Sequence, residues 1–116
     1  MEDIKKVLRK FAEERDWDRY HNPKNLVMAL SGEIGELTEL FQWLNEDESK
    51  VENLSVKNLE RVKEEIADIF IYLIRLSDKL SIDLIEVTKK KIDINEKKYP
   101  VELSKNNAIK YNRRDE

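Results

Sequence analysis

Apolar residues recur along most of this chain at spacings of three and four, the spacing that marks one face of an α-helix. The chain contains only two glycines and two prolines, and both prolines, Pro23 and Pro100, stand where the periodicity is interrupted. This pattern predicts an all-α fold. We expect four helices, with ends placed to within about two to four residues: 3–18, 24–45, 56–80 and 83–98.

Local signals support the starts of these helices. Pro23 suits the first turn of the second helix, where its missing N–H costs nothing. Ser55 can cap the third helix, and Asp83, with Glu86 three residues later, resembles a capping box for the fourth. Short polar connections are expected at 19–23, 46–55 and 81–82.

A chain of 116 residues predicts one domain. We expect a single helical domain over residues 1–100, followed by an extended tail over 101–116, where the periodicity is weak. The third helix is apolar around most of its circumference between Ile66 and Leu76. Either a subunit interface or a central helix packed by its three neighbours would account for this excess.

Composition removes several classes of function. With 22 basic and 25 acidic residues, the net charge of −3 offers no general attraction to nucleic acid or to an anionic membrane. The absence of cysteine excludes disulfides, thiolate metal sites and cysteine nucleophiles. No segment resembles a signal peptide, and no apolar stretch approaches the roughly 18 residues of a membrane span. We therefore expect a soluble, cytoplasmic protein.

Two acidic pairs, Glu33-x-x-Glu36 and Glu65-x-x-Asp68, interrupt otherwise apolar helical stripes. Asp68 lies in the run 66–76, whose only other charged residue is Arg75, so we expect it to be at least partly buried. An unpaired carboxylate away from water is costly, and proteins neutralise it, pair it or coordinate it to a cation. Glu33 occupies a core position in the apolar register Leu26, Leu30, Leu37, Leu40 and Leu44.

These pairs predict a metal site. Residues three apart on a helix point to nearly the same side, so two antiparallel helices can bring four carboxylates together. Carboxylate oxygens suit hard cations such as Mg²⁺, with Mn²⁺ as a substitute. We expect two or more ions, because a polyanionic substrate and a cluster of four carboxylates would still repel each other with only one. The alternative is chance spacing on solvated helices, since 41% of the residues are charged.

Two glycines, Gly32 and Gly35, flank Glu33 inside the second predicted helix. Each costs about 1 kcal/mol relative to alanine in a helix interior. They predict either the close approach of another backbone or a ligand, or tight helix packing.

The chain lacks the residues that several other types of catalytic site require. The chain has no G-x-x-x-x-G-K phosphate loop, and its only histidine, His21, lies outside both acidic pairs. A di-iron bundle would need Glu-x-x-His on two helices, and a Ser-His dyad has no supporting motif. Hydrolysis by a water that metal activates is the chemistry that remains.

The spacing E-x-x-E, then E-x-x-D, resembles that of the all-α nucleoside triphosphate pyrophosphohydrolases, the MazG-like proteins. The stretches 11–17, 21–26, 32–43, 68–73 and 91–100 look like the dCTP pyrophosphatase branch of that family, and the resemblance covers roughly residues 6 to 111. It implies a four-helix bundle protomer in a homodimer or a dimer-of-dimers tetramer. It also implies hydrolysis of dCTP, including forms modified at the 5-position, to the monophosphate and pyrophosphate.

The resemblance also implies roles for individual residues. Glu33, Glu36, Glu65 and Asp68 would be the catalytic Mg²⁺ ligands. His21, Trp17, Trp43 and Tyr72 would recognise the base. Lys91, Asn95 and Lys98 would bind the phosphates. Asn25 belongs to a matching substrate-binding motif. Taken alone, the lysines and Asn95 fit a solvated helix end, the tryptophans fit a core, and His21 fits a helix-entry position. Tyr72 follows Asp68 by four residues and should border the metal site under either interpretation.

Three other functions stay open. A broader MazG-like hydrolase or a dUTP-preferring one would use the same site for a different base. A non-catalytic helical oligomer would use the carboxylates to bind a stabilising metal. The leading hypothesis is an enzyme that removes dCTP from the nucleotide pool.

Overall fold

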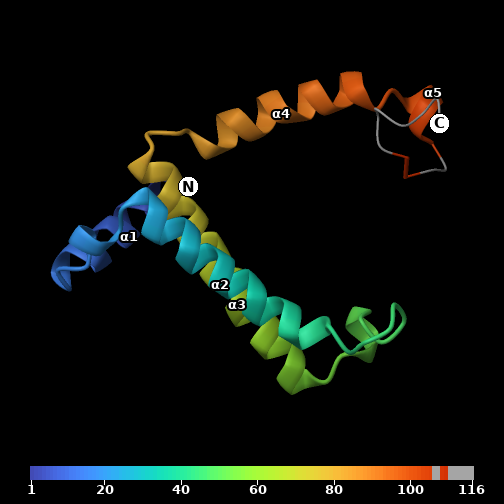
Figure 1. Ribbon diagram of the computed structural model, residues 1–116, viewed down its shortest axis with the longest axis horizontal. Coiled ribbons are helices and arrows are strands. Elements are labelled where there is room, and N and C mark those ends of the chain that lie inside the picture. The colour runs from blue at the N-terminus through green and yellow to red at the C-terminus, as the bar shows by residue number, and fades with distance from the viewer. Residues whose placement is uncertain (106–107, 110–116) are drawn as a thin grey trace. The chain divides into compact units, whose positions relative to one another are not determined.

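The structure is a computed structural model that describes residues 1–105 and 108–109, and all regular structure in these residues is helical (Figure 1). The all-α prediction is therefore confirmed for this part of the chain. The α-helices are α1 (Glu2–Glu14), α2 (Pro23–Phe41), α3 (Val56–Lys79), α4 (Leu84–Lys98) and α5 (Val101–Ser104). Two short 3-10 helices, η1 (Asp18–Tyr20) and η2 (Val51–Asn53), lie in the connections.

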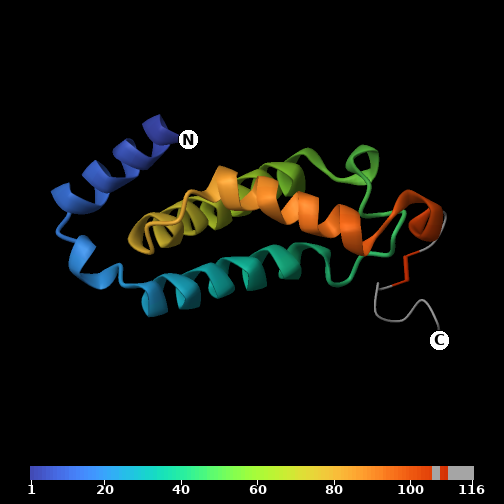
Figure 2. The same ribbon diagram turned by 90° about the horizontal axis from the view of Figure 1, so that it is seen from above.

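The chain divides into two compact units, Met1–Ile82 and Asp83–Glu116. In the first unit, α2 and α3 run antiparallel along each other and α1 contacts α3 (Figures 1 and 2). The second unit consists of α4, α5 and the residues that follow. No helix among the described residues is long and apolar enough to cross a membrane.

The core of the first unit is small. Its buried apolar residues are Ala12 of α1, Leu26 of α2, and Val62 and Ile74 of α3. Leu26 and Ile74 are each only 1% exposed. Removing such apolar area from water is the main favourable term in folding. Because one core residue comes from α1, one from α2 and two from α3, this burial fixes the helix pair that carries the acidic residues.

The predicted helix starts are confirmed to within one residue. Pro23 is the first residue of α2, as expected. At α3, the Ser55 hydroxyl accepts a hydrogen bond from the Asn58 backbone N–H at 3.1 Å. At α4, the Asp83 carboxylate accepts one from the Glu86 N–H at 3.1 Å. Each cap satisfies a backbone donor that the first helical turn leaves unpaired.

Two predicted helix ends lie four residues beyond the observed ends, at the limit of the expected precision. The first helix ends at Glu14 instead of 18, because Asp16 adopts a left-handed conformation (φ 54°) and turns the chain. The second ends at Phe41 instead of 45. There, Asn45 and Glu48 each accept a hydrogen bond from the other's backbone N–H, at 2.8 and 2.9 Å, and this turn replaces further helix.

The predicted extended tail is wrong at its start, where residues 101–104 form the helical turn α5. The carbonyl of Pro100 accepts hydrogen bonds from the N–H groups of Leu103 and Ser104, both at 3.0 Å, and so begins the turn. Residues 106–107 and 110–116 of the predicted tail lie outside the described residues. The single domain over 1–100 stays a prediction.

Candidate metal and nucleotide site

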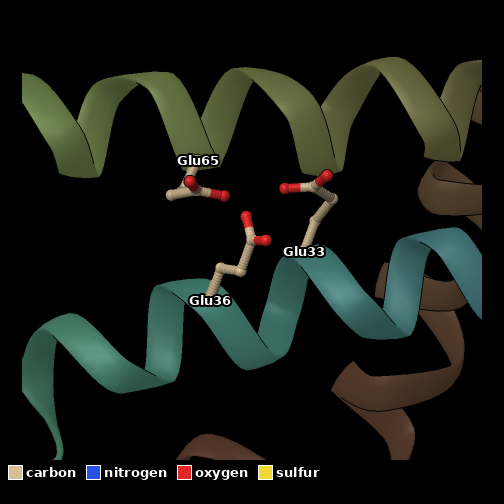
Figure 3. Close-up of side chains that lie close together, drawn as sticks. All are labelled: Glu33, Glu36 and Glu65. Carbon is tan, nitrogen blue, oxygen red and sulfur yellow. The ribbon is translucent and has the colours of Figure 1, made fainter.

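Three glutamates from two helices converge between α2 and α3. Glu33 and Glu36 extend from α2 and Glu65 extends from α3, and all three side chains point into the space between the helices (Figure 3). One carboxylate oxygen from each lies within 4.8 Å of the others. The spacing of three residues places Glu33 and Glu36 on the same side of α2, as predicted.

The electrostatics of this cluster are unfavourable without a proton or a cation. The Oε2 atoms of Glu33 and Glu65 are buried and have no hydrogen-bond partner among the described residues. The pKa of Glu33 is raised to about 7, first because it can share a proton with Glu65, then because of burial, and then because of Glu36 and Asp68. The cluster is therefore a site that favours positive charge.

Asp68, the fourth predicted ligand, lies outside the group within 4.8 Å. It is partly buried, as predicted, and its charge contributes to the raised pKa of Glu33. Asp68 and Glu33 both line a cavity beside the cluster. The structure thus brings three of the four carboxylates together and places the fourth on the wall of the adjoining cavity.

This cavity has a volume of about 370 Å³, within the range of small-molecule sites. Its wall combines apolar and aromatic side chains with two carboxylates, one imidazole and one guanidinium. The lining residues are Leu8, Phe11, Ala12, Trp17, His21, Glu33, Asp68, Ile71, Tyr72 and Arg75. Three predicted base-recognition residues, Trp17, His21 and Tyr72, therefore share one cavity with two predicted metal ligands.

The aromatic wall depends on the early end of α1. After the left-handed Asp16, the Trp17 N–H donates to the Ala12 carbonyl at 2.9 Å, which turns the indole back toward α1. Trp17 packs edge-to-face on Phe11, with ring centroids 5.7 Å apart, and lies 6.4 Å from the ring of His21. Trp17 remains 45% exposed, so part of the indole is accessible to a ligand.

Arg75 is the buried cation of the site, only 3% exposed. Its Nη2 donates to the Asp18 carboxylate at 2.9 Å, and its Nε donates to Nδ1 of His21 at 3.4 Å. Its Nη1 lies 3.7 Å from the Asp78 carboxylate. The pKa of His21 is lowered, mainly by burial and then by the positive charge of Arg75, while Asp18 acts in the opposite direction.

Both acidic partners of Arg75 have a second cation. Lys79 donates to Asp18 at 2.7 Å, and Arg9 forms two hydrogen bonds with Asp78, at 2.7 and 2.5 Å. These charges lower the pKa of both aspartates, through Lys79 and Arg75 at Asp18 and chiefly through Arg9 at Asp78. The network joins α1, η1 and α3 around His21.

Sequence reasoning gave Arg75 no role in the site. A signal was present, because a lone cation within the apolar run 66–76 must find a partner if that run is buried. Leu8, Phe11 and Ile71 carried no separate signal, since apolar residues at these positions fit an ordinary core.

Several other predicted site residues have different surroundings. The Asn25 side chain donates to the Tyr20 carbonyl at 3.0 Å, so its amide holds the connection from η1 to α2, and Asn25 does not line the cavity. Trp43 follows the end of α2, is 87% exposed and does not line the cavity. Their roles in substrate binding stay predictions. The same holds for the residues on α4, in the second unit: Lys91, Asn95 and Lys98.

The two glycines of α2 have open surroundings. A Cβ atom built at Gly32 or Gly35 would meet no atom within 4 Å in the described structure. Within the described part of this chain, neither tight helix packing nor the approach of another backbone accounts for the two glycines. The approach of a ligand or of a second copy of the chain stays a prediction.

The profile of the MazG-like family matches residues 28–113. The chain belongs to the MazG-like family. The resemblance that the acidic pairs indicated is thus confirmed.

Curated relatives agree with this assignment. The chain is 43% identical over 111 residues to dCTP pyrophosphatase 1 of Bos taurus and 40% identical over 111 residues to that of Homo sapiens. Each match covers 96% of this chain and 66% or 65% of the relative, so the chain spans just under two thirds of their length. It also resembles the crystal structure of a pyrophosphatase from Archaeoglobus fulgidus (TM-score 0.75, 45% identity), covering 86% of this chain and 92% of that one.

Proposed function

We propose that this MazG-like protein is a metal-dependent nucleoside triphosphate pyrophosphohydrolase that converts dCTP to dCMP and pyrophosphate. The observation that carries the proposal is the carboxylate cluster beside an aromatic cavity large enough for a nucleoside. The relatives named dCTP pyrophosphatase 1 support cytosine as the base. An enzyme of the nucleotide pool would act in the cytoplasm.

The residues of the cluster fit Mg²⁺. Two buried carboxylate oxygens lack a donor, the pKa of Glu33 is raised to about 7, and every side chain of the cluster offers oxygen, the ligand that Mg²⁺ prefers. Glu33, Glu36 and Glu65 would hold the metal, with Asp68 as a further ligand. We expect two or more ions, with Mn²⁺ as an alternative. Bound there, Mg²⁺ would neutralise the phosphates and activate the attacking water.

The chain's own residues would orient the substrate and exclude water. Trp17 offers an indole face on which a pyrimidine can stack, and His21 offers a polar ring atom to the edge of the base. Tyr72 lines the same cavity as Asp68 and Glu33, so it would border both the base and the carboxylates. One of the carboxylates would accept the proton of the attacking water, as the bond from the α-phosphorus to the bridging oxygen breaks and pyrophosphate leaves.

Residues outside the cavity would complete the substrate site. Lys91, Asn95 and Lys98 would bind phosphate oxygens, since cationic and amide groups stabilise a transferring phosphoryl group. Asn25 would support base binding by holding the connection before α2, next to His21. The exposed indole of Trp43 lies past the other end of α2, so it would cover a base held by a second copy of the chain.

We also propose that the protein is a homodimer or a homotetramer. Ile66 and Phe70, one turn apart on α3, are 53% and 42% exposed, and Ile34 of α2 is 48% exposed. Large apolar side chains grouped on one helix are typical of a surface that a partner covers. Because the family resemblance implies dimers or tetramers, the expected partner is a second copy of the chain.

The test is hydrolysis of a panel of nucleoside triphosphates with Mg²⁺, with the phosphate products resolved. The expected result is monophosphate plus pyrophosphate, fastest from dCTP. The same products with equal rates for all bases, or fastest from dUTP, would keep the reaction and overturn the base preference. Metal-dependent melting without turnover of any nucleotide would overturn the enzyme and favour a non-catalytic oligomer.

A further inference from the structure

The arrangement of Arg75 and His21 fixes which nitrogen of the imidazole carries the proton. His21 lines the cavity, and its Nδ1 lies 3.4 Å from the Arg75 Nε, which donates to it. A guanidinium has hydrogen-bond donors and no acceptor, so Nδ1 must present its lone pair. A neutral imidazole that accepts at Nδ1 carries its hydrogen on Nε2.

We propose that Arg75 is a positioning residue that holds His21 as the neutral Nε2–H tautomer, so that the cavity offers an N–H donor to N3 of a cytosine base. The identity of the base rests on the proposed function; the tautomer does not. Among the described residues, Nε2 of His21 has no hydrogen-bond partner, so this donor is available to a ligand.

The position of Arg75 is itself fixed. The side chain is 4% exposed, and its Nη2 and Nη1 face Asp18 and Asp78 at 2.9 and 3.7 Å. Each aspartate also pairs with another cation, Lys79 or Arg9. A buried guanidinium held by two carboxylates has little freedom to turn away from the imidazole.

The same network keeps the imidazole neutral. A proton on Nδ1 would set two positive groups against each other at the Arg75 contact. Burial, Arg75 and Lys79 all lower the pKa of His21, and only Asp18 opposes them. Of these charged groups, α3 contributes Arg75 and Lys79, and η1 contributes Asp18. The ring is therefore neutral at and above the ordinary titration range of histidine, near pH 6.5.

This tautomer gives the cavity a means to choose between pyrimidines. N3 of cytosine is an acceptor, whereas N3 of uracil and of thymine carries a hydrogen. An Nε2–H donor can therefore bond to cytosine but faces another donor when uracil or thymine binds. A site built to bond to one polar atom discriminates well against an analogue that leaves its own group unpaired.

The first test is nuclear magnetic resonance of the imidazole nitrogens, which is direct because His21 is the chain's only histidine. The wild-type protein at pH 7.5 should show the neutral Nε2–H tautomer. Arg75→Met should give a mixture of tautomers and a higher pKa of His21. The aspartates keep Lys79 and Arg9 in this variant, so no buried carboxylate loses every partner.

A matched control is Lys63→Met on α3, where Lys63 forms an exposed pair with Glu60. It should leave both the tautomer and the pKa of His21 unchanged. A wild-type spectrum with the Nδ1–H tautomer, or with a doubly protonated ring at pH 7.5, would overturn the proposal even if Arg75→Met failed to fold.

The second test is the ratio of kcat/KM for dCTP over dUTP. Arg75→Met should lower this ratio about tenfold, the effect of one hydrogen bond. His21→Gln, which keeps a side-chain N–H donor, should retain more of the ratio than His21→Leu. An unchanged ratio in Arg75→Met and His21→Leu would overturn the assignment to N3. If the wild-type protein hydrolysed no nucleotide, the proposed function would fail, while the spectrum would still decide the tautomer.

Discussion

Glu33 carries a carboxyl group that is hard to ionise in the folded protein, since its pKa is about 7 against an ordinary value of 4.5. Between these two values the folded state binds more protons than the unfolded state, so this group makes stability fall as pH rises from 4.5 through 7. Its favourable contribution is fully present below pH 4.5 and lost above 7. A bound cation would remove this cost, because it favours the ionised carboxylates.

This linkage predicts that Mg²⁺ raises the melting temperature more at pH 8 than at pH 6. At pH 6 the metal must displace the proton of Glu33, whereas at pH 8 that proton has already left. Thermal melting with and without Mg²⁺ at both pH values measures the difference. An equal or larger stabilisation at pH 6 would contradict the placement of the metal at Glu33.

The carboxylates should matter for turnover and little for folding. Glu36→Gln and Asp68→Asn are each expected to lower kcat by about 100-fold or more, because each removes a negative ligand of the metal. Circular dichroism should show an unchanged helix content, since Glu36 is exposed and Asp68 is only partly buried. Glu64→Gln, at an exposed position next to Glu65, is the control and should keep its activity. Lost folding together with wild-type activity in the soluble fraction would contradict this assignment.

At the residue scale, motif spacing predicted the carboxylates and the position of Tyr72 beside them, whereas Trp17 and His21 were predicted from the resemblance to the MazG-like family. Spacing could not predict the contacts of Arg75 with Asp18 and His21, because these residues reach α3 only through packing, whereas Asp78 lies three residues after Arg75 on the same helix. For the same reason it did not separate Glu65, whose oxygen lies within the tight group, from Asp68, which lies on the cavity wall.

Among the elements, helix starts were predictable and two helix ends were not. A start depends on a local capping side chain such as Ser55 or Asp83, which the sequence displays. The ends depend on whether a local turn is favoured over another turn of helix, and the apolar spacing does not reveal this. Asp16 leaves the helical conformation, and the pair of Asn45 and Glu48 forms a turn of its own.

The contribution of the Ser55 cap of α3 to stability can be measured. Ser55→Ala should lower the free energy of unfolding by about 1 kcal/mol, because the N–H of Asn58 loses its acceptor. Urea denaturation at a fixed protein concentration gives this value. Ser31→Ala, at an exposed position inside α2, provides the comparison and should cause no loss. Equal effects of the two substitutions would show that the cap contributes nothing specific.

For the whole molecule, the apolar character of α3 was noticed in the sequence, but two explanations remained open there. Within the first unit, the packing of α1 and α2 against α3 leaves Ile66 and Phe70 exposed. A subunit interface on this face of α3 stays the proposal. Sequence alone could not decide this, because the same apolar run serves either arrangement.

Phe70→Glu should therefore weaken self-association. Burial of one phenylalanine side chain contributes about 1.5–3 kcal/mol, and an unpaired carboxylate in the interface adds a further cost. Sedimentation equilibrium should show an oligomeric wild-type protein and a variant shifted toward monomer. Val56→Glu, at a position 81% exposed at the start of α3, should leave the oligomer intact. A wild-type protein that is monomeric at all concentrations would contradict the interface.

We expect the cluster of Glu33, Glu36 and Glu65 to bind the metal that activates water against a nucleotide held in the adjoining cavity. A crystal structure with Mn²⁺ and a dCTP analogue that cannot be hydrolysed between its α- and β-phosphates tests this directly. Anomalous density should lie at the three glutamates, and the cytosine base should lie against Trp17 and His21. Metal bound elsewhere, or a base outside this cavity, would contradict it.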